Sequence, residues 1–279
     1  MSKFKLNDYI PTTDPLWTDE KMELSKPKSD LNKSFLSNVA YGYDKLIRND
    51  LDSRGSDKEE IQHDFISNSL RLVIPERYDI ISKSESIDNT YGEYLLPILG
   101  DDTKQIDITI LDMKYNRPVL CISSKFPNAS YMKNSPNYKN DLCGEALRLY
   151  ESNPDMPLFA FYIMMSRIPV FEKGKKITRF DNLSNVADSY DDIARVIVNK
   201  YKFLKGFGLM ILDDNVVNEN IGEIKTLEKF KQLHQKPFEL DFTPGKTYEN
   251  IIYNDFDKFI NMILGYIKEY EEKMENQVI

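Results

Sequence analysis

The run from Leu158 to Met165, LFAFYIMM, constrains the fold more than any other stretch of this sequence. It is apolar at every position and is bounded by Pro157 and Arg167. A strand that is apolar throughout, and not only at alternate positions, is covered on both of its faces. The run therefore favours a central strand in a sheet that lies between two layers of helices.

The segments around this run alternate between strand and helix patterns. In chain order we expect strands over 105–112 and 119–125, a helix from about Asn140 to Glu151, the strand 158–165, a helix over 191–203 and a buried strand over 207–212. Such an order implies a mixed sheet with helices on both faces. We predict an α/β fold, with a central mixed β-sheet flanked by helices and with helical N- and C-terminal additions.

The chain has 279 residues, of which 41% are hydrophobic, enough for one large domain. We divide it into an N-terminal arm and helix (1–50), an α/β core (51–215) and a helical C-terminal addition (216–279). Apolar residues recur in this addition at alternating steps of four and three: Phe256, Ile260, Ile263, Ile267 and Tyr270. That spacing is typical of a seam between helices. The stripe is expected to pack on its own domain, and dimerisation through it is the alternative.

Composition excludes several classes of protein. No apolar run approaches the length of a membrane span, and the first residues lack the hydrophobic segment of a signal peptide, so we expect a soluble, cytoplasmic protein with no membrane partner. Two cysteines cannot build a disulfide framework or a four-ligand zinc site. With His63 and His234 as the only histidines, histidine-based chemistry has little to draw on.

Residues 105–125 read as a hairpin, because Ile106, Ile108 and Ile110 alternate with other residues before a polar turn. A turn about Asn116, a residue that tolerates left-handed backbone angles, would place Asp107 opposite Lys125. It would also place Asp112 opposite Leu120. That position is five residues along the strand from Lys125, or roughly 17 Å at about 3.4 Å per residue. On that register only Asp107 can meet the lysine.

An acid facing a lysine at the open end of a hairpin resembles the PD-(D/E)xK nuclease superfamily, in which these groups hold a divalent metal against a phosphodiester. Here Ile106 precedes Asp107 where the family has Pro, and the tripeptide Ser123-Ser124-Lys125 lacks the strand carboxylate. Some restriction endonucleases of the superfamily carry S-x-K and supply the second carboxylate from the following helix. In this chain Glu145, twenty residues after Lys125, would fill that place.

The resemblance implies a role for each of these residues. Asp107 and Glu145 would hold Mg²⁺, which prefers octahedral oxygen coordination and retains waters. Lys125 would orient or deprotonate the attacking water and offset charge on the phosphorus. Ser123 could hydrogen-bond a metal-bound water.

Each residue also has a structural alternative. Asp107 lies in an apolar strand, where an acid needs a partner, and a salt bridge with Lys125 would supply one. Glu145 could instead form a surface pair with Arg148. At the start of a predicted helix that ends near Val73, Glu59 and Glu60 could either add an acid to the site or stabilise the helix dipole.

The charge distribution bears on partners more than the net charge of −8 does. Residues 126–140, read as a loop, carry two lysines and no acid, and Arg167–Asp181 holds five basic residues against two acidic ones. Residues 248–275 hold seven acids against three lysines. We expect the loops 126–140 and 166–182 to contact DNA, where arginine and lysine can pair with guanine edges. The candidates are Lys133, Lys139, Arg167, Lys175 and Lys176.

The resemblance thus implies a Mg²⁺-dependent endodeoxyribonuclease, similar to the type II restriction enzymes, that acts on double-stranded DNA as a homodimer. One alternative is a non-catalytic nucleic-acid-binding protein of the same fold, because Ser123 stands where a carboxylate is expected. Another is an interaction protein whose acidic C-terminal helix docks a partner.

Overall fold

The computed structural model describes residues 31–48, 51, 63, 66–67, 70–71, 74–82, 94–98, 102–172, 175–235 and 238–276. In chain order its elements are α1 (Leu31–Arg48), β1 (Tyr78–Ser82), β2 (Tyr94–Ile98), β3 (Asp102–Ile106), β4 (Ile108–Asp112), β5 (Arg117–Lys125), α3 (Tyr131–Ser152), β6 (Leu158–Met165), β7 (Arg167–Glu172), β8 (Lys176–Asn182), α4 (Val186–Ala194), the π-helical segment η2 (Arg195–Lys200), β9 (Gly206–Asp214), α5 (Asn215–Asn220), α6 (Leu227–Leu233), β10 (Leu240–Phe242), β11 (Ile252–Tyr253) and α7 (Phe256–Asn276).

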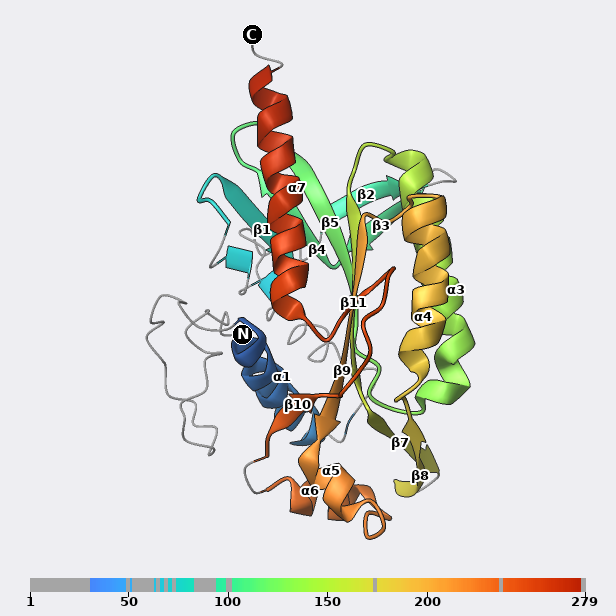
Figure 1. Cartoon of the computed structure of the whole chain (residues 1–279). Coiled ribbons are helices and arrows are strands. Elements are labelled where there is room, and N and C mark those ends of the chain that lie inside the picture. The colour runs from blue at the N-terminus through green and yellow to red at the C-terminus, as the bar shows by residue number, and fades with distance from the viewer. Residues whose placement is uncertain are drawn as a thin grey trace.

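A mixed sheet forms the centre of the molecule, with strand order β1-β4-β5-β6-β9-β10 and with β11 also paired to β9 (Figure 1). The strands β1, β4 and β5 are antiparallel, whereas β5, β6 and β9 are parallel. Two antiparallel ribbons, β2–β3 and β7–β8, lie outside this sheet. The predicted α/β class, with a mixed sheet and flanking helices at both ends of the chain, is confirmed.

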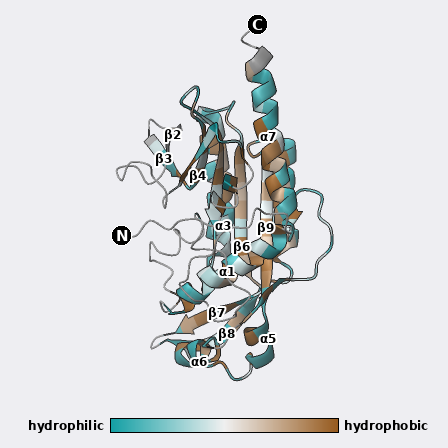
Figure 2. Ribbon diagram, turned by 90° about the vertical axis from the view of Figure 1, so that its left-hand side faces the viewer, coloured by the Kyte–Doolittle hydropathy of each residue, from teal (hydrophilic) through white to brown (hydrophobic). Residues whose placement is uncertain are grey.

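The central strand β6 packs against helices on both faces. The ring of Phe161 lies 6.0 Å from Phe35 of α1 and 4.6 Å from Phe259 of α7. The next residue, Tyr162, points the other way and lies 5.5 Å from Tyr190 of α4. Both faces of the strand are therefore dry, which is why its sequence is apolar at every position. Figure 2 shows the hydrophobic colouring along β6 and β9.

The apolar stripe of α7 packs within the chain. Phe256, Ile260, Ile263 and Ile267 are all buried. Gly208 in β9 permits the close approach, because a Cβ there would lie 2.7 Å from the ring carbons of Phe161 and Phe259. The expectation that the stripe packs on its own domain is confirmed, so it is not available as a dimer interface.

The irregular segment predicted over 126–140 is largely helical, because α3 begins at Tyr131 and passes through Pro136. Tertiary contacts explain the difference. The buried ring of Tyr131 stacks on Tyr138 at 5.6 Å, and its hydroxyl donates to the hydroxyl of Tyr190 at 3.0 Å. These contacts outweigh the local preference of Asn, Ser and Pro for turns.

Two further predictions about this half of the chain were wrong in conformation or extent. The loop expected over 166–182 is the β7–β8 ribbon, whose inner positions Ile168 and Ile177 are buried. Pro169 is tolerated there because the ribbon has only two strands and one side of β7 needs no strand partner. The helix expected over 191–203 begins at Val186 and continues as the π-helical segment to Lys200.

The C-terminal part of the chain contributes strands to the central sheet as well as helices. The region 216–279, predicted to be a helical addition, contains α6 and α7 but also supplies β10 and β11 to the central sheet. The N-terminal arm, Glu59 and Glu60 lie outside the described residues. No helix in the described ranges is long and apolar enough to cross a bilayer.

Candidate functional site

The predicted hairpin forms, but its register is shifted by two residues. Ile108 of β4 pairs with Ile122 of β5, whereas a turn centred on Asn116 would have paired it with Ser124. The turn spans four residues, 113–116, and only its last residue, Asn116, has the left-handed backbone expected there, with φ 49°. Because side chains alternate along a strand, a shift of two keeps Ile108, Thr109 and Ile110 on the same face relative to β5 as predicted.

Asp112 has a different partner from the one predicted. It pairs with Arg117, not with Leu120, because the two-residue shift is followed by a bulge after Ile110 that moves the register by one further residue. The Asp112 carboxylate is fully buried and forms an ion pair with Arg77 at 2.5 Å. Asp112 is thus a structural acid at the end of the hairpin that lies away from Lys125.

Asp107 lies at a bend between β3 and β4, outside both strands, where a single longer strand was predicted. Its Oδ2 accepts hydrogen bonds from the Ser124 backbone N–H at 2.6 Å and the Ser123 hydroxyl at 3.5 Å. Its Oδ1 lies 3.6 Å from Nε2 of His63. None of these interactions involves Lys125, so the predicted alternative of an Asp107–Lys125 salt bridge is wrong.

Lys125 is the last residue of β5 and pairs with Tyr162 of β6. Neighbours in a sheet project to the same side, so Lys125 shares the face on which Tyr162 meets α4. There it lines a cavity of about 300 Å³ together with residues of α3 and β3. The other lining residues are Lys104, Asn140, Asp141, Gly144, Glu145, Arg148 and Leu149.

Glu145 also faces this cavity, because it lies on α3 between the buried side chains of Leu142 and Leu149. Its Oε2 forms an ion pair with Nζ of Lys104 in β3 at 3.4 Å. The surface pair with Arg148 that was the predicted alternative is therefore replaced by a tertiary one. The β2–β3 ribbon packs against α3, which brings Lys104 to this position.

The charges of Asp107, Lys125 and Glu145 affect the pKa values of two nearby tyrosines. Burial raises the pKa of Tyr162 well above its ordinary value, and the negative charges of Glu145 and Asp107 raise it further. Burial also raises the pKa of Tyr138 on α3, while the positive charge of Lys125 opposes that change. The structure thus places Lys125 and Glu145 on one cavity, whereas Asp107 does not line it and instead contacts Ser123, Ser124 and His63.

The carboxylates available for a metal ion are few. Within the described ranges, no group of three or more His, Cys, Asp or Glu side chains lies close enough to hold a metal. Asp107 and Glu145 would be the two protein carboxylates of the predicted site. Proteins commonly bind Mg²⁺ through one or two carboxylates together with waters and substrate phosphates, so two are sufficient.

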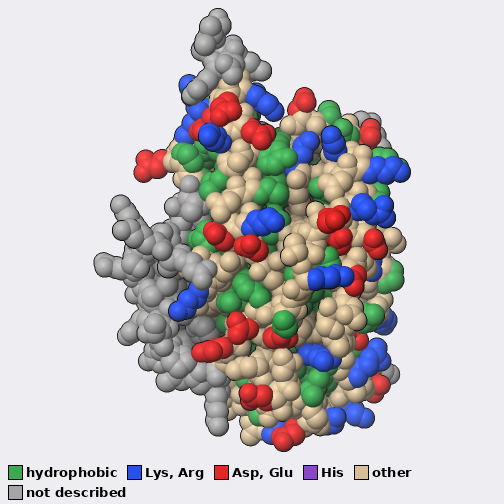
Figure 3. All heavy atoms as spheres, in the orientation of Figure 1, with side chains coloured by type: hydrophobic (Ala, Val, Ile, Leu, Met, Phe, Trp, Pro, Cys, Tyr) green, Lys and Arg blue, Asp and Glu red, His purple; other side chains and the backbone are tan. Residues whose placement is uncertain are grey.

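The predicted DNA-binding residues lie on α3 and on the β7–β8 ribbon. Lys133 is exposed on the first turn of α3, whereas Nζ of Lys139 lies 5.8 Å from the ring centre of Tyr190. Arg167 begins β7 and is half-buried, and Lys175 and Lys176 are exposed at the turn into β8. Figure 3 shows Lys and Arg side chains along the lower right edge of the molecule, the side on which Figure 1 places β7 and β8.

One residue beside this ribbon was not predicted. A bridge between Lys176 and Thr226, together with a hydrogen bond from Ile177 N–H to the Lys225 carbonyl, joins the segment before α6 to β8. Lys225 is exposed and so adds a positive charge next to Lys176. The two lysines are about fifty residues apart in the chain, and no sequence pattern connects them.

His63 is a second residue that the sequence reasoning missed. It is buried and helical, and it contacts Asp107. A signal was present, because His63, Ile66 and Leu70 fall at helical spacing and all three are buried.

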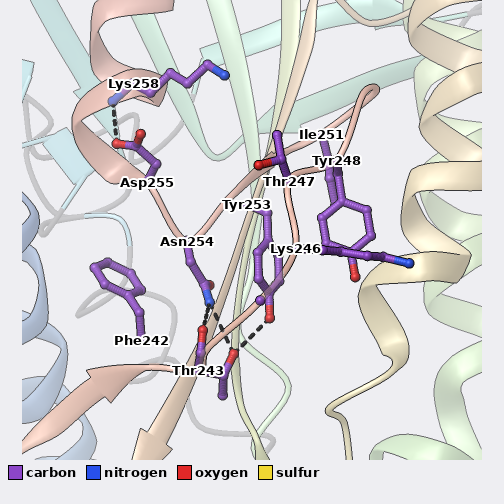
Figure 4. Close-up of a pocket in the computed structure, with 11 residues that line it drawn as sticks. Phe242, Thr243, Lys246, Thr247, Tyr248, Ile251, Tyr253, Asn254, Asp255 and Lys258 are labelled. Carbon is purple, nitrogen blue, oxygen red and sulfur yellow. Dashed lines mark hydrogen bonds between the residues drawn. The ribbon is translucent and has the colours of Figure 1, made fainter.

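A larger cavity, of about 410 Å³, lies on the C-terminal loop before α7 (Figure 4). The hydroxyls of Thr243 and Tyr253 are 2.8 Å apart, and the Asn254 amide donates to the Thr243 carbonyl at 2.7 Å. Lys246 forms an ion pair with Asp188. Since its polar groups largely satisfy one another, this cavity is a product of loop packing.

No family model, no curated protein and no solved structure matches this chain. The comparisons therefore assign it no family.

Proposed function

We propose that this protein is a Mg²⁺-dependent endodeoxyribonuclease that hydrolyses phosphodiester bonds in duplex DNA, resembling the type II restriction enzymes of the PD-(D/E)xK superfamily. One observation carries the proposal. Asp107, at the bend before β4, is hydrogen-bonded to the two serines that precede Lys125, and Lys125 shares a cavity with Glu145 of the following helix. The elements β4, β5, α3, β6, α4 and β9 also follow one another in the strand, strand, helix, strand, helix, strand order predicted from the sequence.

The two carboxylates fit a magnesium ion by their chemistry. Carboxylate oxygens are the hard ligands that Mg²⁺ prefers, and Asp107 and Glu145 are each only partly buried, with 17% of the side chain exposed. When bound, the ion would polarise the scissile phosphate and lower the pKa of an attacking water.

The other residues of the site would position the Asp107 carboxylate and the attacking water, and would stabilise the charge on the phosphate. The Ser124 N–H and the Ser123 hydroxyl hold Oδ2 of Asp107, which leaves its second oxygen towards His63. Ser123 thus orients the acid, a role different from the predicted contact with a metal-bound water. The ammonium of Lys125 would offset the negative charge that develops on the phosphate, and would orient or deprotonate the water.

Duplex DNA would be bound through phosphate contacts from α3 and the β7–β8 ribbon, by Lys133, Lys139, Arg167, Lys175 and Lys176. Such contacts provide most of the sequence-independent affinity and make it depend on salt. We further propose that the protein works in the cytoplasm and that it is a homodimer. A twofold axis would present one site to each strand of the duplex. The buried stripe of α7 is not its interface.

Cleavage of varied DNA in the presence of Mg²⁺ tests the proposal. Wild-type protein should give discrete fragments, and Lys125→Ala should lose cleavage while it still binds DNA. Asp107→Asn should lose both cleavage and metal binding. Asp192→Asn is the matched control, because this acid lies on α4 with 78% of its side chain exposed. Smearing of every DNA, or unchanged cutting by Asp107→Ala, would reject the assignment.

A non-catalytic nucleic-acid-binding protein of this fold is the second candidate. It is favoured by the serine at position 123 and by the ion pair that already engages Glu145. Calorimetry distinguishes the two, because such a protein would bind DNA or RNA without any dependence on Mg²⁺ or Mn²⁺.

A further inference from the structure

Lys104 is the group that meets Glu145, and its place in the chain connects it to the rest of the site. It lies on β3, three residues before Asp107, and its ammonium forms the ion pair with Glu145. Lys104, Glu145 and Lys125 line the same cavity of about 300 Å³. The Lys104 ammonium thus already pairs with the Glu145 carboxylate that would hold the metal ion.

This ion pair is weak enough to be exchanged. At 3.4 Å it is a single contact, and 40% of the Lys104 side chain is exposed. Pairs with this degree of exposure contribute little, because water and salt screen them and the long side chain must be held in one geometry. A divalent ion carries twice the charge and binds the carboxylate oxygen directly, so it should displace the ammonium.

We propose that Lys104 and the metal ion compete for Glu145, and that metal binding releases the Lys104 ammonium to contact a DNA phosphate beside the scissile bond. This inference rests on the proposed nuclease function. In the absence of metal the ion pair keeps Glu145 in place and neutralises it. Once metal is bound, the released ammonium strengthens the binding of DNA.

The exchange makes the two ligands cooperative. Metal binding frees a positive charge for DNA, and by thermodynamic linkage DNA binding must raise the affinity for metal by the same factor. Removing Lys104 should therefore have effects of opposite sign on the two ligands. A residue with a purely structural role would weaken both.

Calorimetry with Mn²⁺ and fluorescence anisotropy with a duplex oligonucleotide measure these effects on Lys104→Ala. Loss of an ion pair of this exposure should tighten metal binding by about two- to fivefold. With EDTA, DNA affinity should fall less than with Ca²⁺, because the ammonium that is removed was paired with Glu145 and not with a phosphate. With Ca²⁺, an oxygen-binding ion, it should fall about threefold or more, and the slope of log K against log salt should lose about one unit.

Arg148→Ala is the matched control, because Arg148 lines the same cavity and carries the same charge, while the ion-pair partner of Glu145 is Lys104. It should alter metal affinity less than Lys104→Ala, and any change in DNA affinity should be equal with and without Ca²⁺. A wild-type protein that binds metal, with Lys104→Ala no tighter than the control, overturns the exchange alone. A wild-type protein that binds neither Mg²⁺ nor Mn²⁺ overturns the nuclease proposal as well.

Discussion

Replacing Asp112 by asparagine separates the structural acid of the hairpin from the proposed catalytic one. Oδ2 of Asp112 accepts from Arg77 Nη2 at 2.5 Å and from the Tyr270 hydroxyl at 2.9 Å. Its Oδ1 accepts from Arg77 Nε at 3.2 Å and from the Lys114 N–H at 2.9 Å. The carboxylate is fully buried and joins β1, β4 and α7. Asp112→Asn keeps the shape of the side chain but removes its negative charge and replaces one accepting oxygen by an NH₂ group.

The structure bounds the size of the effect. Breaking a buried ion pair destabilises a protein by about 3–5 kcal/mol, and each hydrogen bond to a charged group contributes about 1.5–3 kcal/mol. The Arg77 side chain is 28% exposed, so its guanidinium can recover water when the carboxylate is lost. We therefore expect the low end of the range, a loss of about 3 kcal/mol at pH 7, which lowers Tm by about 6–12 °C in a domain of this size.

The loss should depend on pH. Burial raises the pKa of Asp112, but hydrogen bonds from Arg77, Tyr270 and the Lys114 N–H outweigh it and hold the pKa below its ordinary value of 3.8. A lowered folded pKa gives stability that is complete above the unfolded pKa and is lost as the pH falls through the folded one. The difference between wild type and Asp112→Asn should therefore be full at pH 7 and disappear in strong acid.

Urea unfolding followed by circular dichroism, at a series of pH values, measures this difference. Asp192→Asn should change stability by less than about 0.5 kcal/mol, as expected for an exposed acid. Asp112→Asn should keep metal binding, whereas Asp107→Asn should lose it. A loss below about 1 kcal/mol at pH 7, or a loss of metal binding in Asp112→Asn, would refute the separation of roles.

Three other outcomes follow from single contacts. Gly208→Ala should destabilise the protein by about 1–3 kcal/mol in urea, because its Cβ would overlap two aromatic rings, whereas Gly144→Ala, with nothing within 4 Å, should not. His234→Gln should cost about 1.5–3 kcal/mol by the same assay, because Nε2 of the ring forms a hydrogen bond of 2.7 Å with the buried carboxylate of Asp214. Lys176→Ala should lower the slope of log K for DNA binding against log salt by about one unit, whereas Lys268→Ala on α7 should leave this slope unchanged. Equal slopes for the two variants would contradict the proposed DNA surface.

Local sequence patterns predicted the parts of the fold in which buried residues recur at a regular spacing along the chain. The strand β6 was predicted with its bounds, and four of the five residues predicted for the stripe of α7 are buried, because apolar periodicity records which face is covered. The start of α3 could not be predicted in this way. Its first turn is held by contacts of Tyr131 with Tyr138, seven residues along the helix, and with Tyr190, fifty-nine residues away.

The sequence by itself pointed to the residues of the proposed site, an aspartate, a lysine and a helical glutamate. Only the tertiary structure decided their partners. Asp107 meets His63 from a distant helix, and Glu145 meets Lys104 from a separate ribbon. The physical reason is that a side chain's face follows from the two-residue repeat of a strand, whereas its ion-pair partner depends on how independent elements pack.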